Sequence, residues 1–176
     1  GMIVTNNSEF AEQCQILKKN GASKRYYNTS IGWNFKMPDV NAALGISQLK
    51  RIESIIERKN SCAKFYDELF STIPEITAPI VKEYNRTTYM LYSILVKDNK
   101  LREKIRIGLE SQGIETRINF PPMHLQPAYI DRFGDTRGSL PISEDISERI
   151  LGLPIFINMT QTDQELIVNT IKQSMN

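Results

Sequence analysis

The sequence predicts a mixed α/β to α+β fold, and three features of its 176 residues support that prediction. Apolar residues recur at helical spacing from residue 38 to about residue 72. After residue 79 the pattern changes to β-prone runs that alternate with shorter helical segments. The composition, 40% hydrophobic and 24% charged, provides for both a core and a solvated surface. Such alternation of strands and helices is typical of a layered α/β or α+β domain.

The N-terminal region begins with an apolar run and then becomes polar. Residues 1–5 predict a short strand, and Asn6 with Glu9 predicts a capping box at the start of a helix. The buried stripe of that helix is expected to contain Phe10, Ile16 and Leu17. Residues 19–33 are polar and turn-rich, which predicts a loop.

A long helical segment links this region to the rest of the chain. Pro38 suits the first helical turn, whereas Gly45 and Ser47 weaken the early part. We therefore expect a kink or break near Leu49. This pattern divides the chain into residues 1–50, which include the start of the linking helix, and an α+β domain at residues 51–176.

The second part contains the strand–helix alternation. Residues 89–96 predict a strand, and the helix that follows should end at Gly113 in the C′ position. The next expected elements are a strand at 114–118, a proline-rich loop at 120–127, a turn at 134–138, a helix at 143–151 and an extended segment at 153–155. Thr162 with Glu165 predicts a capping box for the final helix.

Charge and composition argue against several classes of function. The 22 basic and 20 acidic residues give a net charge of +2, and the basic pairs at 18–19 and 24–25 are too short for a nucleic-acid patch. No apolar run approaches the roughly 20 residues of a membrane span. Two cysteines make no disulfide framework, and one histidine argues against a zinc site. We expect Cys14 and Cys62 to be buried, reduced thiols of a cytoplasmic protein without metal, nucleic-acid or membrane partners.

Two loops contain the candidate chemistry. His124, the only histidine, lies in a proline-rich loop that could hold its imidazole rigidly at a cleft, although a solvated loop histidine is the simpler alternative. Asn34 and Lys36 lie two residues apart, so an extended chain points both to the same side. An amide donor beside an ammonium suits an anion such as a phosphate, although polar loop residues are again the simpler alternative. A solvated helix face is expected for Glu144, Asp145 and Glu148.

Four ordered segments together resemble the DegT/StrS-type sugar aminotransferases of the DegT/DnrJ family. Residues 32–37 (G-W-N-F-K-M) and 41–49 (N-A-A-L-G-I-S-Q-L) resemble the family pattern G-[YF]-N-x-R-M…A-A-x-G-x-x-Q-L. Residues 120–129 (F-P-P-M-H-L-Q-P-A-Y) are similar to its Y-x-P-P-[IL]-H-x-Q-P-x-Y loop. Residues 143–154 are similar to T-E-x-[IL]-S-E-R-x-L-x-L-P, and residues 1–6 resemble the strand that follows the cofactor lysine.

The resemblance implies the C-terminal portion of an aspartate-aminotransferase-like, pyridoxal-phosphate-dependent enzyme. Residues 1–50 would be a remnant of the large cofactor-binding domain, and 51–176 the small domain. Family members act on nucleotide-linked keto-sugars, usually with glutamate as amino donor, and form homodimers that share their active sites. Their cofactor is held by a Schiff-base lysine just upstream of the strand that residues 1–6 resemble, and no lysine of this chain stands in that context. We therefore expect no catalytic residue in this chain, and no cofactor bound by the chain alone.

The resemblance also implies roles for four residues. Asn34 matches the asparagine that reaches across the dimer to the partner's cofactor phosphate. Lys36 stands where the family has a substrate-contacting arginine, and it keeps the charge but loses the planar two-pronged donor geometry. His124 and Tyr129 match the loop at the substrate entrance and are expected to bind substrate.

Alternatives from other classes stay open. The chain fits part of an aminotransferase of polysaccharide or cell-surface sugar biosynthesis, but it also fits a truncated, catalytically inactive remnant or a regulatory paralogue. Gly1 ahead of Met2 fits either a residue left by a tag on a fragment that starts at this methionine or a glycine of the native sequence. The coding sequence upstream of Met2 is the observation that separates these alternatives.

Overall fold

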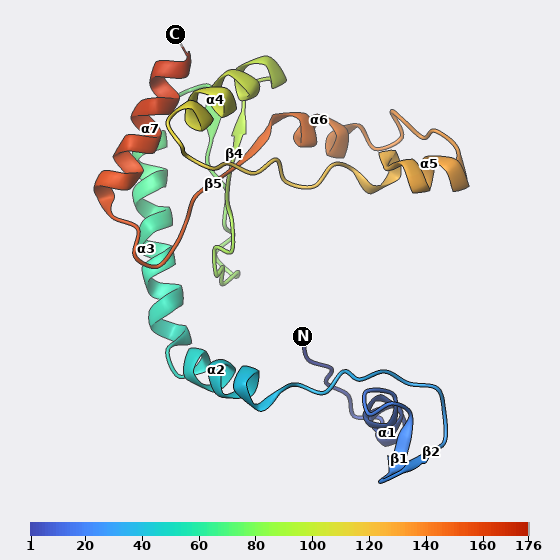
Figure 1. Ribbon diagram of the computed structural model, residues 1–176. Helices are drawn as coiled ribbons and strands as arrows, with labels where there is room; N and C mark the ends of the chain where they lie inside the picture. Colours follow the sequence, from blue (N-terminus) through green and yellow to red (C-terminus); the bar gives the residue numbers. More distant parts are fainter. Residues whose placement is uncertain (176) are drawn as a thin grey trace. The chain divides into compact units, whose positions relative to one another are not determined.

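The computed structural model describes residues 1–175, which divide into two compact units with the boundary along the chain between Arg51 and Ile52. The first unit contains α1 (Ser8–Leu17), β1 (Ala22–Lys24), β2 (Tyr27–Asn28) and α2 (Asp39–Leu49) (Figure 1). The second contains α3 (Ile52–Phe70), β3 (Ile76–Thr77), β4 (Tyr92–Val96), α4 (Asn99–Ser111), the 3-10 helix η1 (Met123–Leu125), α5 (Pro127–Phe133), α6 (Pro141–Arg149), β5 (Ile150–Leu153) and α7 (Gln161–Met175). This mixture of helices and antiparallel strands confirms the predicted fold class.

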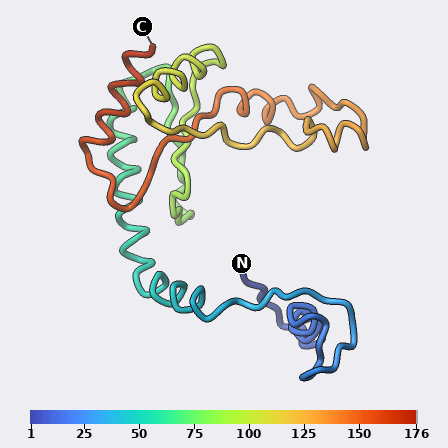
Figure 2. Tube along the Cα trace, in the orientation of Figure 1, coloured from blue at the N-terminus to red at the C-terminus, as the bar shows by residue number. Residues whose placement is uncertain are grey.

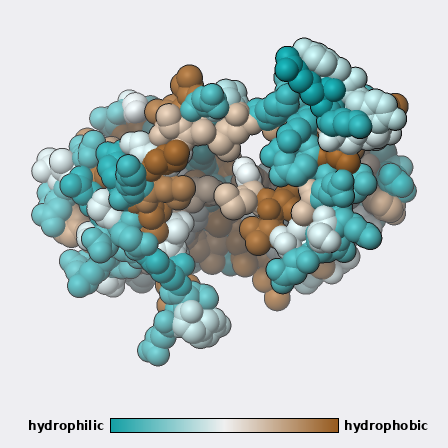
Figure 3. Space-filling model, turned by 90° about the horizontal axis from the view of Figure 1, so that it is seen from below, coloured by the Kyte–Doolittle hydropathy of each residue, from teal (hydrophilic) through white to brown (hydrophobic). Residues whose placement is uncertain are grey.

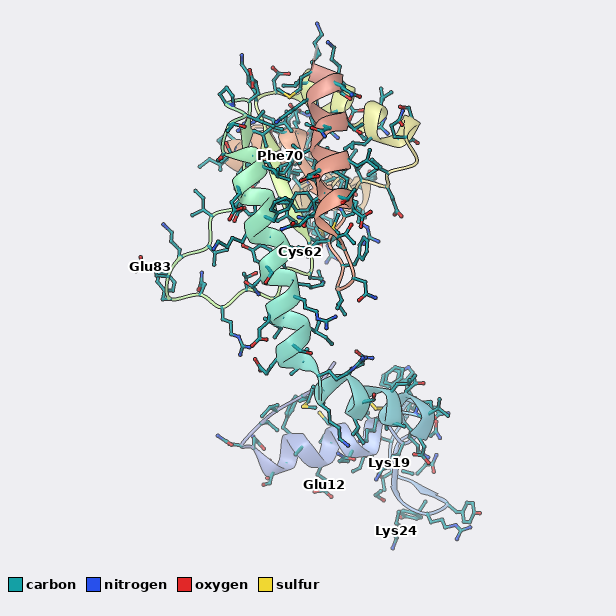
Figure 4. The ribbon with its side chains drawn as sticks, turned by 90° about the vertical axis from the view of Figure 1, so that its left-hand side faces the viewer. Glu12, Lys19, Lys24, Cys62, Phe70 and Glu83 are labelled. Carbon is teal, nitrogen blue, oxygen red and sulfur yellow. The ribbon has the colours of Figure 1, made fainter. Side chains whose placement is uncertain are left out.

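The second unit is built on an antiparallel sheet in the order β3-β4-β5. Tyr92 pairs with Leu153 and Ile94 with Leu151, so these four side chains share one face of the sheet, and all are buried. The Tyr66 ring of α3 stacks on Tyr92 with 4.8 Å between ring centroids. The remaining helical core residues are Cys62, Ala63, Phe70, Ile105, Leu109, Ile167, Val168 and Ile171. Figure 4 shows α3 and α7 side by side, with Cys62 and Phe70 on α3.

The first unit has no comparable core, since no residue of α1 or α2 is buried. The predicted buried stripe of α1 is therefore wrong: Phe10 is 52% exposed, and Ile16 and Leu17 are only half-buried. Main-chain hydrogen bonds hold this unit instead. Trp33 N donates to Leu17 O at 2.8 Å, and Phe35 N donates to Lys18 O at 3.0 Å. The segment after the hairpin is thus fixed against the C-terminal end of α1.

Several boundaries of the first unit differ from the predictions. Residues 1–5 are exposed and pair with no strand among residues 1–175, so the predicted strand is wrong. Asn7, not Asn6, caps α1, because its side chain accepts from the backbone amide of the third helical residue, Phe10, at 3.0 Å. Pro38 is the N-cap of α2 and lies outside the first turn. The predicted loop at 19–33 contains the β1–β2 hairpin.

The linking helix and the strands of the second unit agree more closely. The break near Leu49 is confirmed, because α2 ends at that residue and α3 begins at Ile52. Gly113 ends α4 with a φ of 71°, as predicted. The predicted strand at 89–96 begins only at Tyr92, because Tyr89 has a φ of 44°, which interrupts an extended chain. The predicted strand at 114–118 is reduced to one bridge, from Arg117 to Gly152.

The last two helices are shifted along the chain relative to the predictions. The helix expected at 143–151 is α6, which ends at Arg149, and β5 follows it directly. The capping box of α7 is wrong by two residues. Asp163 Oδ2 accepts from Thr160 N at 2.9 Å, and Thr160 Oγ1 accepts from Asp163 N at 3.2 Å.

Candidate functional site

Asn34 lies on a segment that two glycines hold close to the end of α1. Asn34 forms an isolated bridge with Lys19, so the segment runs alongside residues that follow the helix. A Cβ atom on Gly32 would lie 2.2 Å from Gly21 N, and one on Gly21 would lie 1.7 Å from Ser30 O. Gly21 also has a φ of 77°, which L side chains rarely adopt. The two glycines therefore allow the main-chain crossing that positions Asn34.

The side chains around Asn34 alternate between two sides of the segment. The Trp33 and Phe35 rings stack with 5.8 Å between centroids and 3° between planes, which places both on one side. Asn34 and Lys36 occupy the alternate positions of this segment, where an extended chain is expected to point both to the other side. Both side chains are exposed, and that of Asn34 makes no hydrogen bond within residues 1–175.

Lys36 lines a basic hollow of about 410 Å³ within the first unit. Three more cations line it, namely Lys19, Lys24 and Arg25, and no carboxylate does. Figure 4 marks Lys19 and Lys24 on this part of the chain. Clustered cations and N–H donors without a competing acid favour a polyanionic ligand, such as a phosphate or diphosphate. Asn34 is not among the lining residues of the hollow.

Apart from Lys36, the cations of this hollow come from the two basic pairs that the sequence analysis singled out. The basic pairs at 18–19 and 24–25 are too short for a nucleic-acid patch, but the β1–β2 hairpin folds one member of the first pair and both of the second around Lys36. The hairpin was itself predicted as a loop, so the gathering of these charges could not be foreseen from their spacing.

His124 and Tyr129 lie in the second unit, on an arm formed by η1, α5 and α6. Figure 2 shows the chain running out from the sheet, turning at α5 and returning along α6 to β5. His124 belongs to η1 at the outgoing part of the arm. Tyr129 on α5 is 40% exposed, and its ring contacts Phe133 with 6.1 Å between centroids.

Glu144 of α6 connects the two runs of this arm. Its Oε1 lies 2.9 Å from His124 Nε2, and it also accepts from the amides of Gly138 at 2.9 Å and Leu140 at 3.3 Å. The hydrogen bond from His124 and that from the Gly138 amide lower the pKa of the Glu144 carboxyl. The prediction of a solvated carboxylate is therefore wrong for Glu144, whose side chain is 19% exposed. It is confirmed for Asp145 and Glu148, which are exposed.

Other kinds of site are not found in the described part of the chain. Residues 1–175 contain no group of three or more histidine, cysteine, aspartate or glutamate side chains placed to hold a metal ion. Within the same residues, no helix has the length and apolar character needed to cross a membrane. Cys14 and Cys62 are free, with Cys62 buried and Cys14 half-buried.

The comparison with protein families decides the assignment. The sequence profile described as the DegT/DnrJ/EryC1/StrS aminotransferase family matches residues 1–172. The chain belongs to this family. The resemblance of the sequence motifs is thereby confirmed, and the family is pyridoxal-phosphate-dependent.

Individual relatives support the same assignment. GDP-perosamine synthase of Vibrio cholerae is 32% identical over 183 aligned positions, which cover 100% of this chain and 48% of that protein. The structure of Helicobacter pylori PseC, an aminotransferase involved in the biosynthesis of pseudoaminic acid, matches with a TM-score of 0.87 at 26% identity, over 97% of this chain and 47% of that one. DesV of S. venezuelae, solved in complex with a ketimine intermediate, matches with a TM-score of 0.86 at 25% identity, over 98% and 46%. The chain thus spans about half the length of the curated relatives it matches.

Proposed function

We propose that this chain supplies the C-terminal half of a pyridoxal-phosphate-dependent aminotransferase that acts on nucleotide-linked keto-sugars. The family assignment supports the transaminase chemistry, and the names of the relatives, a GDP-perosamine synthase and a pseudoaminic-acid enzyme, favour sugar substrates. Glutamate is the proposed amino donor, and polysaccharide or cell-surface sugar biosynthesis the proposed setting. The free thiols Cys14 and Cys62 are consistent with the reducing cytoplasm as its location.

The segment from Lys19 to Lys36 is the observation that carries this proposal. Gly21 and Gly32 fix its path, so Asn34 and Lys36 are presented from a defined main chain. In a homodimer, the Asn34 amide would donate to a phosphate oxygen of the partner's cofactor. Lys36 and the basic hollow beside it would take the diphosphate of the nucleotide sugar.

The cofactor itself fits this segment through its phosphate. Asn34 has an exposed amide without another hydrogen-bond partner in residues 1–175, and four cations line the hollow of the same unit. When bound, pyridoxal phosphate supplies an electron sink for breaking bonds at the carbon next to the amino nitrogen. The contribution of this chain is to hold the phosphate and to neutralise the charge of the substrate.

The chain by itself is proposed not to attach the cofactor covalently. One lysine, Lys97, has a serine four residues before it, but that serine lies within strand β4, whereas the family's cofactor lysine directly precedes the segment that residues 1–6 resemble. Incubation with pyridoxal phosphate, reduction with borohydride and peptide mass spectrometry should therefore find no single modified lysine. Stoichiometric modification of one lysine would contradict this part of the proposal.

The decisive experiment joins this chain to an upstream half, taken from its own reading frame or from a relative. The combined protein should bind pyridoxal phosphate and aminate a nucleotide-linked keto-sugar with glutamate. Asn34→Ala should weaken cofactor binding by about tenfold to a hundredfold, because a hydrogen bond to a charged group is lost. Lys36→Ala should raise KM for the nucleotide sugar and leave the cofactor content unchanged.

Lys104→Ala is the matched control for Lys36→Ala, because Lys104 is an exposed lysine on α4 in the other unit. It should change neither quantity. Normal folding with unchanged cofactor affinity in Asn34→Ala would mean that Asn34 does not serve the phosphate. A folded, cofactor-loaded protein without any transamination would favour the inactive remnant or the regulatory paralogue.

A further inference from the structure

His124 and Glu144 form a side-chain pair that closes the arm of the second unit. Glu144 receives three donors: His124 Nε2 at 2.9 Å, Gly138 N at 2.9 Å and Leu140 N at 3.3 Å. Both side chains are largely buried but still reach solvent, with 16% of the His124 side chain and 19% of the Glu144 side chain exposed. The pair therefore joins two segments that are 20 residues apart in the sequence.

The donors around Glu144 determine where the imidazole carries its proton. The carboxyl is ionised at neutral pH, because its hydrogen bonds with His124 and with the Gly138 amide lower its pKa. An ionised carboxylate has acceptor atoms only, so the nitrogen that faces it must donate. Nε2 of His124 therefore carries a proton. In the neutral ring, Nδ1 is then left with a free lone pair.

Nδ1 has no hydrogen-bond partner in the described chain. His124 bonds only through Nε2 within residues 1–175. A lone pair on a neutral ring accepts from O–H or N–H groups and does not attract a phosphate. A carboxylate on the opposite nitrogen makes this lone pair a better acceptor, since hydrogen bonds in a chain polarise one another. The arm thus offers chemistry that the basic hollow of the first unit does not.

We propose that Glu144 is the positioning residue of His124, and that the pair presents Nδ1 as the acceptor for a hydroxyl of the nucleotide-linked sugar. The choice of ligand rests on the proposed function, whereas the position of the proton does not. The ligand group assigned to the arm is a hydroxyl of the sugar ring. His124 then discriminates between sugars that have or lack this hydroxyl.

The first test uses the chain itself, because its single histidine gives one set of imidazole NMR signals. At a pH where the ring is neutral, long-range ¹H–¹⁵N spectra should show Nε2 protonated and Nδ1 unprotonated. Glu144→Ala should expose the Nε2 proton to solvent exchange and speed exchange of the Gly138 amide by about tenfold to a hundredfold. Glu148→Ala is the matched control, because Glu148 is an exposed carboxylate on the same helix whose side chain makes no hydrogen bond within residues 1–175.

Two substitutions separate the roles of the two ring nitrogens. The amide nitrogen of His124→Gln reaches the position of Nε2, whereas the amide of His124→Asn lies near the position of Nδ1. His124→Gln should therefore keep the Gly138 amide protected, and His124→Asn should not. In the combined protein with an upstream half, His124→Gln should raise KM for the nucleotide sugar by about tenfold with kcat nearly unchanged. The KM of His124→Asn should lie between that of His124→Gln and that of the wild type.

The possible failures are distinguishable. A neutral ring protonated at Nδ1, or an Nε2 proton that exchanges as fast in the wild type as in Glu144→Ala, overturns the positioning role. An active enzyme in which His124→Gln keeps the wild-type KM overturns the hydroxyl assignment. A folded wild-type enzyme without transaminase activity overturns the proposed function and the choice of ligand with it, while the NMR result still decides the proton position because it needs no substrate.

Discussion

A methyl group on Gly32 would lie 2.2 Å from Gly21 N and 2.7 Å from Leu17 O. Both neighbours are main-chain atoms, so neither can move aside as a flexible side chain would. We expect Gly32→Ala to displace the segment that carries Asn34 and Lys36. In the combined protein, this variant should therefore lose cofactor affinity and raise KM together, whereas each single site variant changes one of them. Cofactor titration and steady-state kinetics measure both effects.

Gly45→Ala is the control for that prediction. Gly45 lies inside α2, and a Cβ atom there would meet nothing within 4 Å. Replacing a glycine inside a helix by alanine should stabilise it by about 0.5–1 kcal/mol. If Gly32→Ala binds cofactor and substrate as well as Gly45→Ala does, the close main-chain approach at Gly21 and Gly32 does not position Asn34 and Lys36.

At the residue scale, the sequence predicts which side chains lie together within one segment, but not which residues of distant segments become partners. The alternation of Asn34 and Lys36 follows from a spacing of two residues, which an extended chain converts directly into a shared side. The partner of His124 was not predictable in this way. Glu144 has the spacing of a surface helix residue, and only the return of the arm brings it to the imidazole. The sequence offered one indication of this pair, because His124 lies in the motif at 120–129 and Glu144 in the motif at 143–154.

At the element scale, the start of α7 shows why cap positions are hard to predict. Thr160 with Asp163 and Thr162 with Glu165 both satisfy the capping-box pattern, so the sequence holds two candidates two residues apart. Packing decides between them. Met159 is buried, and its sulfur lies 3.9 Å from the Tyr66 hydroxyl, which fixes the residue just before Thr160.

This choice of cap can be tested by substitution. Thr160→Ala should destabilise the folded chain by about 1 kcal/mol, because the hydroxyl that accepts from Asp163 N is lost. Thr162→Ala, at an exposed position inside the first turn, should stay within about 0.5 kcal/mol of the wild type. Urea unfolding followed by circular dichroism compares the two. Equal effects of the two substitutions would show that the cap does not lie at Thr160.

The β1–β2 hairpin was missed for a different reason. Its strands are short and polar, and Tyr26 at the turn has a φ of 61° without being glycine, asparagine or aspartate. Neither alternating hydrophobicity nor typical turn residues therefore predict a hairpin in this segment. The helices were predicted better, since α3, α4 and α7 bury a continuous stripe at helical spacing against the sheet.

At the scale of the whole molecule, the two units differ in how much apolar surface they bury. The core residues all belong to the second unit. The first unit leaves large apolar side chains in solvent, including Ile3, Val4, Phe10, Ile31, Trp33, Phe35, Met37, Val40, Leu44, Ile46 and Leu49. Figure 3 shows hydrophobic residues, in brown, open to solvent on the face that it presents. Exposed apolar surface of this extent marks an interaction surface, which fits the proposed role of this unit as part of a larger domain.

The chain alone is therefore expected to self-associate through its first unit. Val40 and Leu44 lie four residues apart on α2 and are 72% and 61% exposed, so they offer one apolar stripe to a second copy. Sedimentation velocity should show oligomers that dissociate when Leu44 is changed to Glu, because association would then bury an unpaired charge. Ile107→Glu is the matched control, since Ile107 is a 56% exposed residue of α4 in the other unit, and it should leave the oligomers intact. Supplying the upstream half should also suppress this association, because the proposed larger domain covers the same side chains. A chain that stays monomeric at concentrations of about 100 μM, where contacts of even modest affinity are populated, would contradict the prediction and leave the exposed residues of α2 without an interaction role.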